Sequence, residues 1–248
     1  MRDLKIITML CFSNVLLSTV FVNAAPDFII LGVTKCGTTS LYNYLMEHPH
    51  IARTKKKELF FFDSNFKKGI EWYNNKFALK EEGQLIGEAT PGYFWKKGCL
   101  ERIVQHCPKT KFIVLFRDPV KRVISEYLRR RRSGQESRRF GQAIFTHKIP
   151  YLEAGMYINH LERWLSFFPR EQIHIVIAED LFAKPEKEVN KVFKFLGLKE
   201  HRLASYPNHN KADNKLDVDP KTMNFLKKLY RPYNQLLRKF LGRSLPWR

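Results

Sequence analysis

Residues 28–40, FIILGVTKCGTTS, decide the fold of this chain. Four apolar residues lead into a loop between Gly32 and Gly37, and three hydroxyl-bearing residues then begin an amphipathic segment. A buried strand that turns directly into a helix leaves backbone N–H groups exposed in the loop, next to the positive end of the helix dipole. This pattern predicts an anion site, with a phosphate group as its typical ligand.

The loop is similar to a Walker A loop because four residues separate its two glycines, but its lysine lies elsewhere. Thr38 stands where that motif requires lysine, and Lys35 lies inside the loop instead. There Lys35 is expected to reach the bridging or terminal oxygens of a bound phosphate, while Thr38 and Thr39 add hydroxyl donors. The alternative is an ordinary strand-to-helix turn with a solvated lysine.

A second anion anchor is predicted where the apolar run KFIVLF, residues 111–116, meets Arg117. Asp118 and Pro119 follow, and proline is well suited to the first turn of a helix. Since ligands of open α/β sheets bind at the carboxyl ends of the strands, we expect Arg117 and Ser125 to bind a second phosphate. The alternative is an ion pair between Arg117 and Asp118. Two anchors without an acidic Walker B strand argue against a magnesium nucleotide.

Short apolar runs rich in Ile, Val and Phe alternate with amphipathic stretches along the chain. This alternation is typical of parallel strands covered on both faces by helices. It predicts an α/β, P-loop-like three-layer fold with a central, mostly parallel sheet, in one domain over 26–248. Strands are expected at 27–32, 84–88, 111–116 and 172–178, and helices at 38–47, 68–79, 99–106, 119–132, 157–167, 185–196 and 220–241.

The chain is strongly basic, since its 248 residues include 44 Lys and Arg against 24 Asp and Glu, a net charge of +20. An apolar fraction of 44% suffices for a sizeable core and excludes intrinsic disorder for most of the chain. Four cysteines are too few for a disulfide scaffold. Lys55–Lys57 and the arginine-rich segment 121–139 suit an acidic polymer, with a solvated surface as the alternative. No motif for binding nucleic acid is present.

The first 25 residues predict a targeting segment. Ile6–Val22 carry no charge, and small residues follow at 23–25. We expect a signal peptide or, as the alternative, a retained signal anchor, and hence a protein of the secretory pathway, in the Golgi lumen or secreted.

In a helix, Cys99 and Cys107 would lie about 12 Å apart, too far to form a disulfide. No cluster of Cys and His predicts a metal site.

Several motifs resemble, in the same order, those of the sulfotransferases that use 3′-phosphoadenosine 5′-phosphosulfate (PAPS), a donor with two phosphate groups. GVTKCGTTSL (32–41) resembles the family's 5′-phosphosulfate loop, and RDPVKRVISEY (117–127) resembles its 3′-phosphate segment. Four further segments are similar to those of the heparan sulfate and Golgi-type carbohydrate sulfotransferases and their bacterial relatives: KKKELFFFD (55–63), GEATPGYF (87–94), 155–181 and 228–242. The resemblance covers residues 26–248.

The resemblance implies an enzyme that moves the sulfuryl group of PAPS to a hydroxyl or amine of a carbohydrate, in particular a glycosaminoglycan-like polysaccharide, without a metal. It implies Glu58 as general base, Lys35 as the residue that stabilises the leaving oxygen, and His160 as a further catalytic candidate. The residues implied for the donor are Lys35, Cys36, Gly37, Thr38, Thr39, Ser40, Arg117 and Ser125, and those implied for the acceptor are Lys57, Thr90, Tyr93 and Arg129.

Two positions depart from the family pattern: Phe60 stands where several relatives have His, and Ala89 where glycosaminoglycan enzymes often have Lys. The loop that closes over the nucleotide has only a poor match, at 208–215. Two other functions stay open, a P-loop nucleotide kinase or NTPase and a non-catalytic secreted protein that binds heparin. The displaced lysine disfavours the first, and the retained Lys35 and Glu58 disfavour the second. A membrane partner is expected only for a retained anchor, and the oligomeric state is open.

Overall fold

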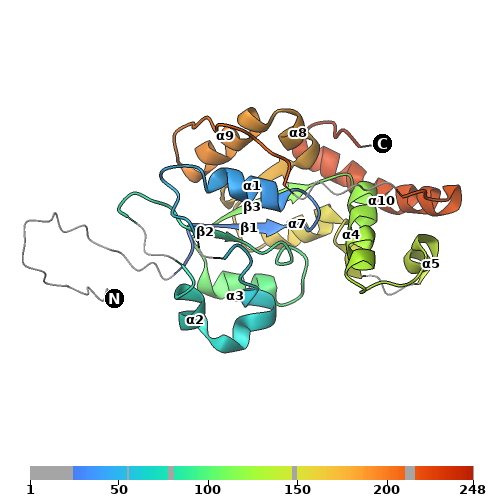
Figure 1. The fold of residues 1–248 in the computed structure, drawn as a ribbon, viewed down its shortest axis with the longest axis horizontal. Coiled ribbons are helices and arrows are strands. Elements are labelled where there is room, and N and C mark those ends of the chain that lie inside the picture. The colour runs from blue at the N-terminus through green and yellow to red at the C-terminus, as the bar shows by residue number, and fades with distance from the viewer. Residues whose placement is uncertain (1–24, 55, 78–80, 147–149, 210–215, 248) are drawn as a thin grey trace, which may run out of the picture.

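The computed structural model describes residues 25–54, 56–77, 81–146, 150–209 and 216–247 (Figure 1). The predicted targeting segment therefore lies outside the described residues, apart from Ala25. Within them, the strands form one parallel sheet in the order β2-β1-β3-β4. Their bounds are β1 Phe28–Gly32, β2 Gly87–Ala89, β3 Lys111–Phe116 and β4 Ile173–Ile177.

Helices cover both faces of the sheet, with α1, α8 and α9 on one face and α2 and α3 on the other (Figure 1). The α/β three-layer prediction is therefore confirmed. The helix bounds are α1 Thr38–Leu45, α2 Ile70–Asn74, α3 Cys99–His106, α4 Pro119–Arg132, α5 Phe140–Phe145, α6 Pro150–Glu153, α7 Tyr157–Leu165, α8 Ala178–Ala183, α9 Pro185–Leu196 and α10 Pro220–Leu241. A π-helix η1 (Phe61–Asn65) and two 3₁₀ turns, η2 (Phe66–Lys68) and η3 (Arg170–Gln172), complete the described elements.

The sheet forms the centre of the main hydrophobic core. Every residue of β1 is buried, and so is every residue of β3 after Lys111. Helix α7 packs on β3 through Trp164, whose ring centroid lies 5.2 Å from that of Phe112. A second, smaller core joins α4, α5 and α10, where Val123, Ile144 and Leu226 pack together. The second core holds α4, and hence its arginines, just beyond the carboxyl end of β3.

Most predicted elements agree with the structure, but the segments between the phosphate loop and β2 do not. In place of the helix expected at 68–79, the structure has the shorter helix α2. In place of the strand expected at 84–88, it has the short strand β2, preceded by a single bridge between Ile51 and Leu85. Cys99 and Cys107 are both buried free thiols, as their spacing predicted. In the described part of the chain, no helix is both long and apolar enough to cross a bilayer.

Candidate active site

The loop between β1 and α1 passes so close to its neighbours that glycine is required at both ends. Gly32 has a φ of 142°, and a Cβ atom there would lie 2.4 Å from the carbonyl oxygen of Pro91. Gly37 has a φ of 91°, and its Cβ would lie 2.9 Å from the ring of Phe182. Both glycines are therefore set by backbone conformation and by close packing. Lys35, between them, also adopts a positive φ, of 71°.

The amino end of α1 is open to an anion. Gly37 occupies the N-cap position, no side chain caps the helix, and its first turn holds no acidic residue. The first backbone N–H groups of a helix need acceptors, and the helix dipole favours a negative one. Thr38 is buried at this end, whereas Thr39 is half-buried. The loop thus fits the phosphate-type ligand that its sequence predicted.

Arg117 connects the end of β3 to this loop. Because β1 and β3 are adjacent and parallel, their carboxyl ends lie at the same edge, and Nη1 of Arg117 donates to the carbonyl of Lys35 at 3.1 Å. The hydroxyl of Tyr157 in turn donates to the carbonyl of Arg117 at 2.8 Å. The Asp118 carboxylate does not pair with Arg117, since it caps α4 by accepting from Val120 N at 2.9 Å. Arg117 therefore keeps its predicted place beside the phosphate loop.

Lys35 lies in a strongly positive environment. Burial lowers its pKa, and Arg129, Arg132 and Arg117 lower it further, while Glu126 opposes them. Burial and nearby positive charges both disfavour the ammonium form of lysine. A bound anion would offset that positive charge, so the electrostatics of the loop also fit a phosphate or a phosphosulfate.

Ser125 and Arg129 are four residues apart on α4 and so lie on one face of that helix. Ser125 is buried, with 3% exposure. Arg129 forms a bidentate pair with the buried Glu126, with N–O distances of 3.0 and 2.7 Å. Burial alone would raise the pKa of Glu126, but the hydrogen bonds from Arg129 and Arg130 outweigh it and lower that pKa. The Arg129 guanidinium is thus held in place by α4 itself.

One ammonium group joins the phosphate loop to the candidate general base. Nζ of Lys57 donates to Oγ1 of Thr39 at 3.1 Å and lies 2.6 Å from Oε1 of Glu58. The Glu58 side chain is 34% exposed, so an acceptor hydroxyl has access to it. The carbonyl of Lys57 accepts from Ala89 N at 3.1 Å, which ties this segment to β2. Residues that are distant in sequence therefore form one site.

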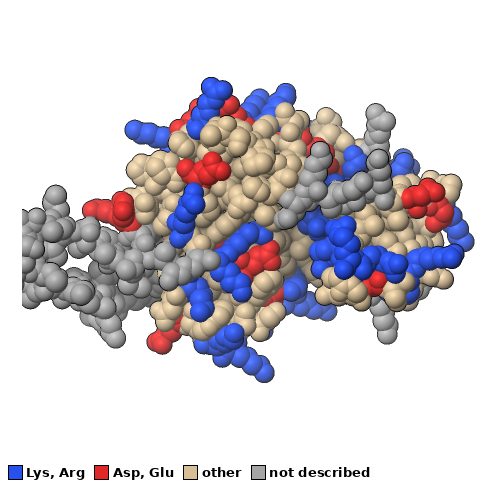
Figure 2. Space-filling view, viewed as in Figure 1, with Lys and Arg blue, Asp and Glu red and all other residues tan. Residues whose placement is uncertain are grey.

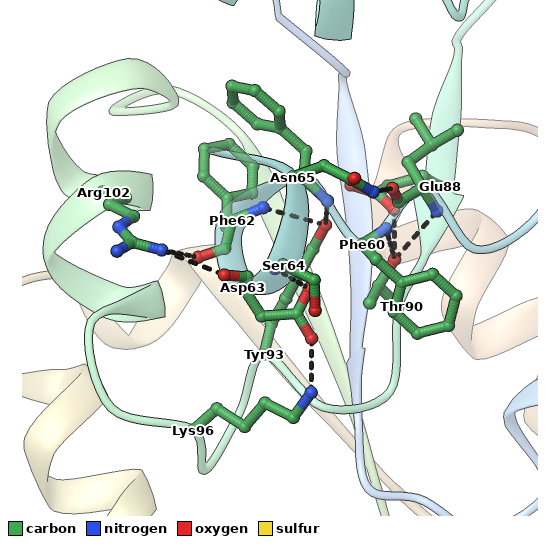
Figure 3. Close-up of polar contacts among 12 residues, drawn as sticks. Phe60, Phe62, Asp63, Ser64, Asn65, Glu88, Thr90, Tyr93, Lys96 and Arg102 are labelled. Atoms are coloured by element: carbon green, nitrogen blue, oxygen red, sulfur yellow. Dashed lines mark hydrogen bonds and ion pairs between the residues drawn. The ribbon is translucent and has the colours of Figure 1, made fainter. Parts of the chain in front are cut away.

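Two hydroxyl groups hold the backbone that follows Glu58 (Figure 3). Thr90 Oγ1 accepts from the N–H groups of Leu59 and Phe60 at 3.2 and 3.3 Å. Tyr93 Oη accepts from Phe61 N at 2.7 Å and from Phe62 N at 3.3 Å. Both side chains are fully buried. Both hydroxyl groups are thus buried and bonded to backbone, and a contact of Thr90 or Tyr93 with the acceptor stays a prediction.

Two predicted donor residues use their side chains within the protein. The Cys36 thiol is fully buried, 3.8 Å from the Tyr157 hydroxyl, and burial raises its pKa to about 11. The Ser40 hydroxyl, also buried, accepts from His209 N at 3.0 Å. Neither side chain is thereby directed to a ligand. Ser40 instead anchors the start of the 208–215 segment, of which 210–215 lies outside the described residues.

His160 lies on α7, where its Nε2 is 3.0 Å from the carbonyl oxygen of Glu153. Its ring meets the edge of Phe94 at 5.8 Å between centroids. Burial lowers its pKa. The His160 ring thus bonds to the carbonyl at the end of α6 and packs on Phe94, and none of these contacts directs it towards Glu58.

Sequence reasoning missed two buried residues beside the site, Glu88 and Tyr73. Glu88, on β2, accepts from the Thr90 hydroxyl at 2.6 Å and from the Tyr73 hydroxyl at 2.7 Å. Burial raises the pKa of Glu88 to about 7. A signal was available, since Glu88 falls inside the GEATPGYF motif and at the end of the strand expected at 84–88, which was predicted to be buried on both faces.

Lys and Arg side chains lie over much of the face drawn in Figure 2, and their largest group lies on one part of it. Figure 2 shows Lys and Arg side chains concentrated where Figure 1 draws α4 and the chain that follows it. Four arginines, Arg129–Arg132, occupy the last turn of α4. Among the described residues, no three His, Cys, Asp or Glu side chains are arranged to hold a metal ion.

The family model of the sulfotransferase domain matches residues 25–224. Heparan sulfate glucosamine 3-O-sulfotransferase 5 of Mus musculus is 31% identical over 261 residues, covering 91% of this chain and 75% of that protein. Heparan sulfate glucosamine 3-O-sulfotransferase 3B1 of Homo sapiens is 30% identical, covering 90% of this chain and 65% of that protein.

Solved structures show the same fold. A sulfotransferase from Alicyclobacillus acidocaldarius superposes with a TM-score of 0.72 at 26% identity, covering 89% of this chain and 97% of that one. Mouse sulfotransferase SULT7A1, complexed with PAP, superposes with a TM-score of 0.59 at 13% identity, covering 87% and 89%. At that identity the second similarity concerns the fold alone.

Proposed function

Because this chain belongs to the sulfotransferase-domain family and is a PAPS-dependent sulfotransferase, we propose that it sulfates a hydroxyl or amine of a carbohydrate, namely a glycosaminoglycan-like polysaccharide. The observation that carries the proposal is the Lys57 ammonium, which contacts both Thr39 and Glu58. It holds Glu58, the candidate base, beside Thr39 of the phosphate loop. Base and donor loop thus share one site.

When bound, PAPS supplies a sulfuryl group attached to a phosphate oxygen. The nucleotide, which departs through that oxygen, is a good leaving group. Sulfuryl transfer resembles phosphoryl transfer, in which positioning and electrostatics provide most of the catalysis. Glu58 takes the proton of the acceptor hydroxyl as its oxygen forms the new bond to sulfur. The Lys35 ammonium stabilises the negative charge left on the departing phosphate oxygen. No further co-reactant is needed for charge or proton balance.

The second phosphate of the donor is assigned to Arg117 and Ser125. Arg117 is fixed to the phosphate loop through the carbonyl of Lys35. Ser125 lies on α4, which begins two residues after Arg117. The loop N–H groups with Thr38 and Thr39 bind the other phosphate. This division leaves Lys57 to bridge donor and base, and Arg129 at the acceptor side.

An acidic polysaccharide acceptor is supported by the relatives and by charge. The two curated relatives are named for heparan sulfate glucosamine. The arginines of α4 provide a positive surface near Lys35, as their effect on its pKa indicates. Clustered positive charge attracts a polyanion and fixes its orientation. Because residue 89 is alanine, the positive charge that many such enzymes place there does not contribute to acceptor binding in this chain.

The secretory pathway is the proposed location, because the acceptor would be made there and residues 1–25 read as a signal peptide or anchor. A sulfate-transfer assay with labelled PAPS tests the function. We expect label in heparan sulfate or a related glycosaminoglycan, and none in a phenol such as 4-nitrophenol. Label in the phenol alone would overturn the carbohydrate assignment. Hydrolysis of ATP without any sulfate transfer would support the kinase or NTPase alternative.

A further inference from the structure

The backbone directly after Glu58 is held in an unusual conformation by a side chain. Phe60 has φ 51° and ψ 30°, in the left-handed region that a large residue rarely adopts. Its N–H and that of Leu59 both donate to Thr90 Oγ1. Strained backbone persists only where its surroundings fix it, and it is concentrated at functional sites. Thr90 is therefore a restraint on the segment that carries the candidate base.

The Thr90 hydroxyl has a single arrangement that satisfies all of these contacts. A hydroxyl has one proton to donate and two lone pairs to accept with. The two N–H groups occupy both lone pairs, so the proton needs an acceptor of its own. Glu88 Oε2, 2.6 Å away, is that acceptor. Both side chains are fully buried, so the direction of the Thr90 proton is set inside the protein.

Glu88 also accepts a hydrogen bond from a side chain that takes no part in this arrangement. Its other oxygen, Oε1, accepts from the hydroxyl of Tyr73 on α2 at 2.7 Å. The Tyr73 ring also stacks on Phe61 at 4.6 Å between centroids, so the Tyr73→Phe variant, which keeps the ring, removes the hydroxyl contact alone. A variant at Tyr73 thus changes the environment of Glu88 but leaves an acceptor for the Thr90 proton. This makes Tyr73 a natural control position.

We propose that Glu88 is a positioning residue for sulfuryl transfer, which acts by accepting the Thr90 proton and thereby directing the Thr90 lone pairs to Leu59 and Phe60. Glu88 touches neither donor nor acceptor in this role. Through Thr90 it fixes the direction in which Glu58 leaves the backbone. The inference rests on the proposed role of Glu58 as general base. It goes beyond that role by assigning the residue that fixes the orientation of the base.

The chemistry of the contact distinguishes this role from a requirement for charge. Thr90 needs only an acceptor oxygen, so a side-chain amide can serve as well as a carboxylate. Glu88→Gln retains such an oxygen, whereas Glu88→Leu has a similar volume and none. Thr90→Ser retains the hydroxyl, whereas Thr90→Val keeps the shape and loses it. Together these pairs separate acceptor, hydroxyl, charge and volume.

The experiment measures steady-state sulfate transfer at pH 8 for each variant of the full chain. We expect Glu88→Leu and Thr90→Val each to lower kcat about 10- to 100-fold, since a misplacement of about 1 Å can cost 100-fold. KM for PAPS should stay within about twofold, because the phosphate loop is untouched. Glu88→Gln, Thr90→Ser and Tyr73→Phe should keep kcat within about threefold. The double variant Glu88→Leu/Thr90→Val should be no slower than the worse single one.

Hydrogen exchange gives a second readout that does not depend on turnover. Amides of the 57–62 segment should exchange faster in Glu88→Leu and Thr90→Val than in the wild type, and those of β3 should not. If the wild type transfers sulfate but Glu88→Leu keeps full kcat and normal exchange at 57–62, the positioning role is wrong. If Glu88→Gln is as slow as Glu88→Leu, charge rather than acceptance matters, and the proposal is equally overturned. A wild type without transfer instead refutes the proposed function, and exchange alone then decides whether the restraint exists.

Discussion

The ammonium of Lys57 lies 2.6 Å from Oε1 of Glu58. The same nitrogen lies 3.1 Å from the Thr39 hydroxyl, so it connects the base to the donor loop. An ion pair this exposed contributes little to stability on its own. The ion pair matters for geometry, because it fixes the position of the Glu58 carboxylate relative to the phosphate loop.

We predict that Lys57→Met lowers kcat about 10- to 100-fold, the equivalent of losing a hydrogen bond to a charged group. The reason is that Glu58 and Thr39 lose their shared partner. Lys56→Met is the matched control, since Lys56 is an exposed neighbour of the same charge. Sulfate-transfer kinetics check both. An equal loss in the two variants would mean that only the general positive charge of this segment matters.

Glu58→Gln should lower transfer at least about 100-fold, because the amide cannot take the acceptor proton. The change is nearly isosteric, so the fold and the donor loop should be unaffected. Calorimetry with 3′-phosphoadenosine 5′-phosphate checks that point, and its affinity should match that of the wild type. Transfer at the wild-type rate would remove Glu58 from the mechanism.

Lys35→Ala should lower kcat about 100- to 1,000-fold, the range found when one stabilising group of a developing anion is removed. Burial and the surrounding arginines lower the pKa of Lys35, so its removal relieves like-charge repulsion in the free protein. We therefore expect thermal unfolding at the same or a higher temperature, with the loss confined to turnover. A variant that both unfolds early and loses turnover would contradict this separation.

Arg117→Ala should weaken binding of 3′-phosphoadenosine 5′-phosphate about 10- to 100-fold, since charge-assisted contacts to phosphate are strong. The guanidinium also braces the Lys35 carbonyl, so a smaller loss of kcat should accompany it. Arg163→Ala serves as the control, because Arg163 pairs with the exposed Glu101 on the surface. Unchanged affinity in Arg117→Ala, measured by calorimetry, would exclude it from the donor site.

The strand-loop-helix unit and the nearness of Arg117 to it were predictable because their signals are local. A strand, a glycine and a helix start are read from adjacent residues, and parallel strands bring their carboxyl ends to one edge. The contacts of 57–62 with Glu88, Thr90 and Tyr93 are not local. Nothing in a lysine-glutamate-aromatic run indicates a left-handed Phe60 followed by a π-helix.

Three residues of the motif pattern show why a motif alone does not reveal what a hydroxyl group bonds to. Thr90, Tyr93 and Ser40 are hydroxyl residues in the right motifs, so they resemble ligand contacts. In the structure each hydroxyl accepts from backbone, Thr90 and Tyr93 from two N–H groups each and Ser40 from that of the half-buried His209. Backbone N–H groups cost free energy if they are buried and left unpaired. Sequence shows which residues gather at a site, but not which of them face inward.

The last prediction concerns pH and Glu88, whose pKa burial raises from 4.5 to about 7. Between those values the folded protein holds a proton that the unfolded chain has released. Stability from this group is therefore full below about pH 4.5 and is lost as pH rises through 7, a total on the order of 3 kcal/mol. Tyr73, Thr90 and Tyr93, which surround the carboxyl, do not titrate in this range.

Other groups act in the opposite direction, so the wild type alone cannot reveal this effect. Burial lowers the pKa of His174 from 6.5 to about 4, which makes the folded protein more stable as pH rises across that interval. Glu88→Gln removes only the Glu88 contribution. Urea unfolding at pH 5 and at pH 7.5 should show the wild type losing about 2.4 kcal/mol relative to Glu88→Gln, somewhat less than the total because pH 5 already lies above the unfolded pKa. Parallel pH dependence in the two proteins would mean that Glu88 titrates near its ordinary value, and that the carboxyl is better solvated than its burial indicates.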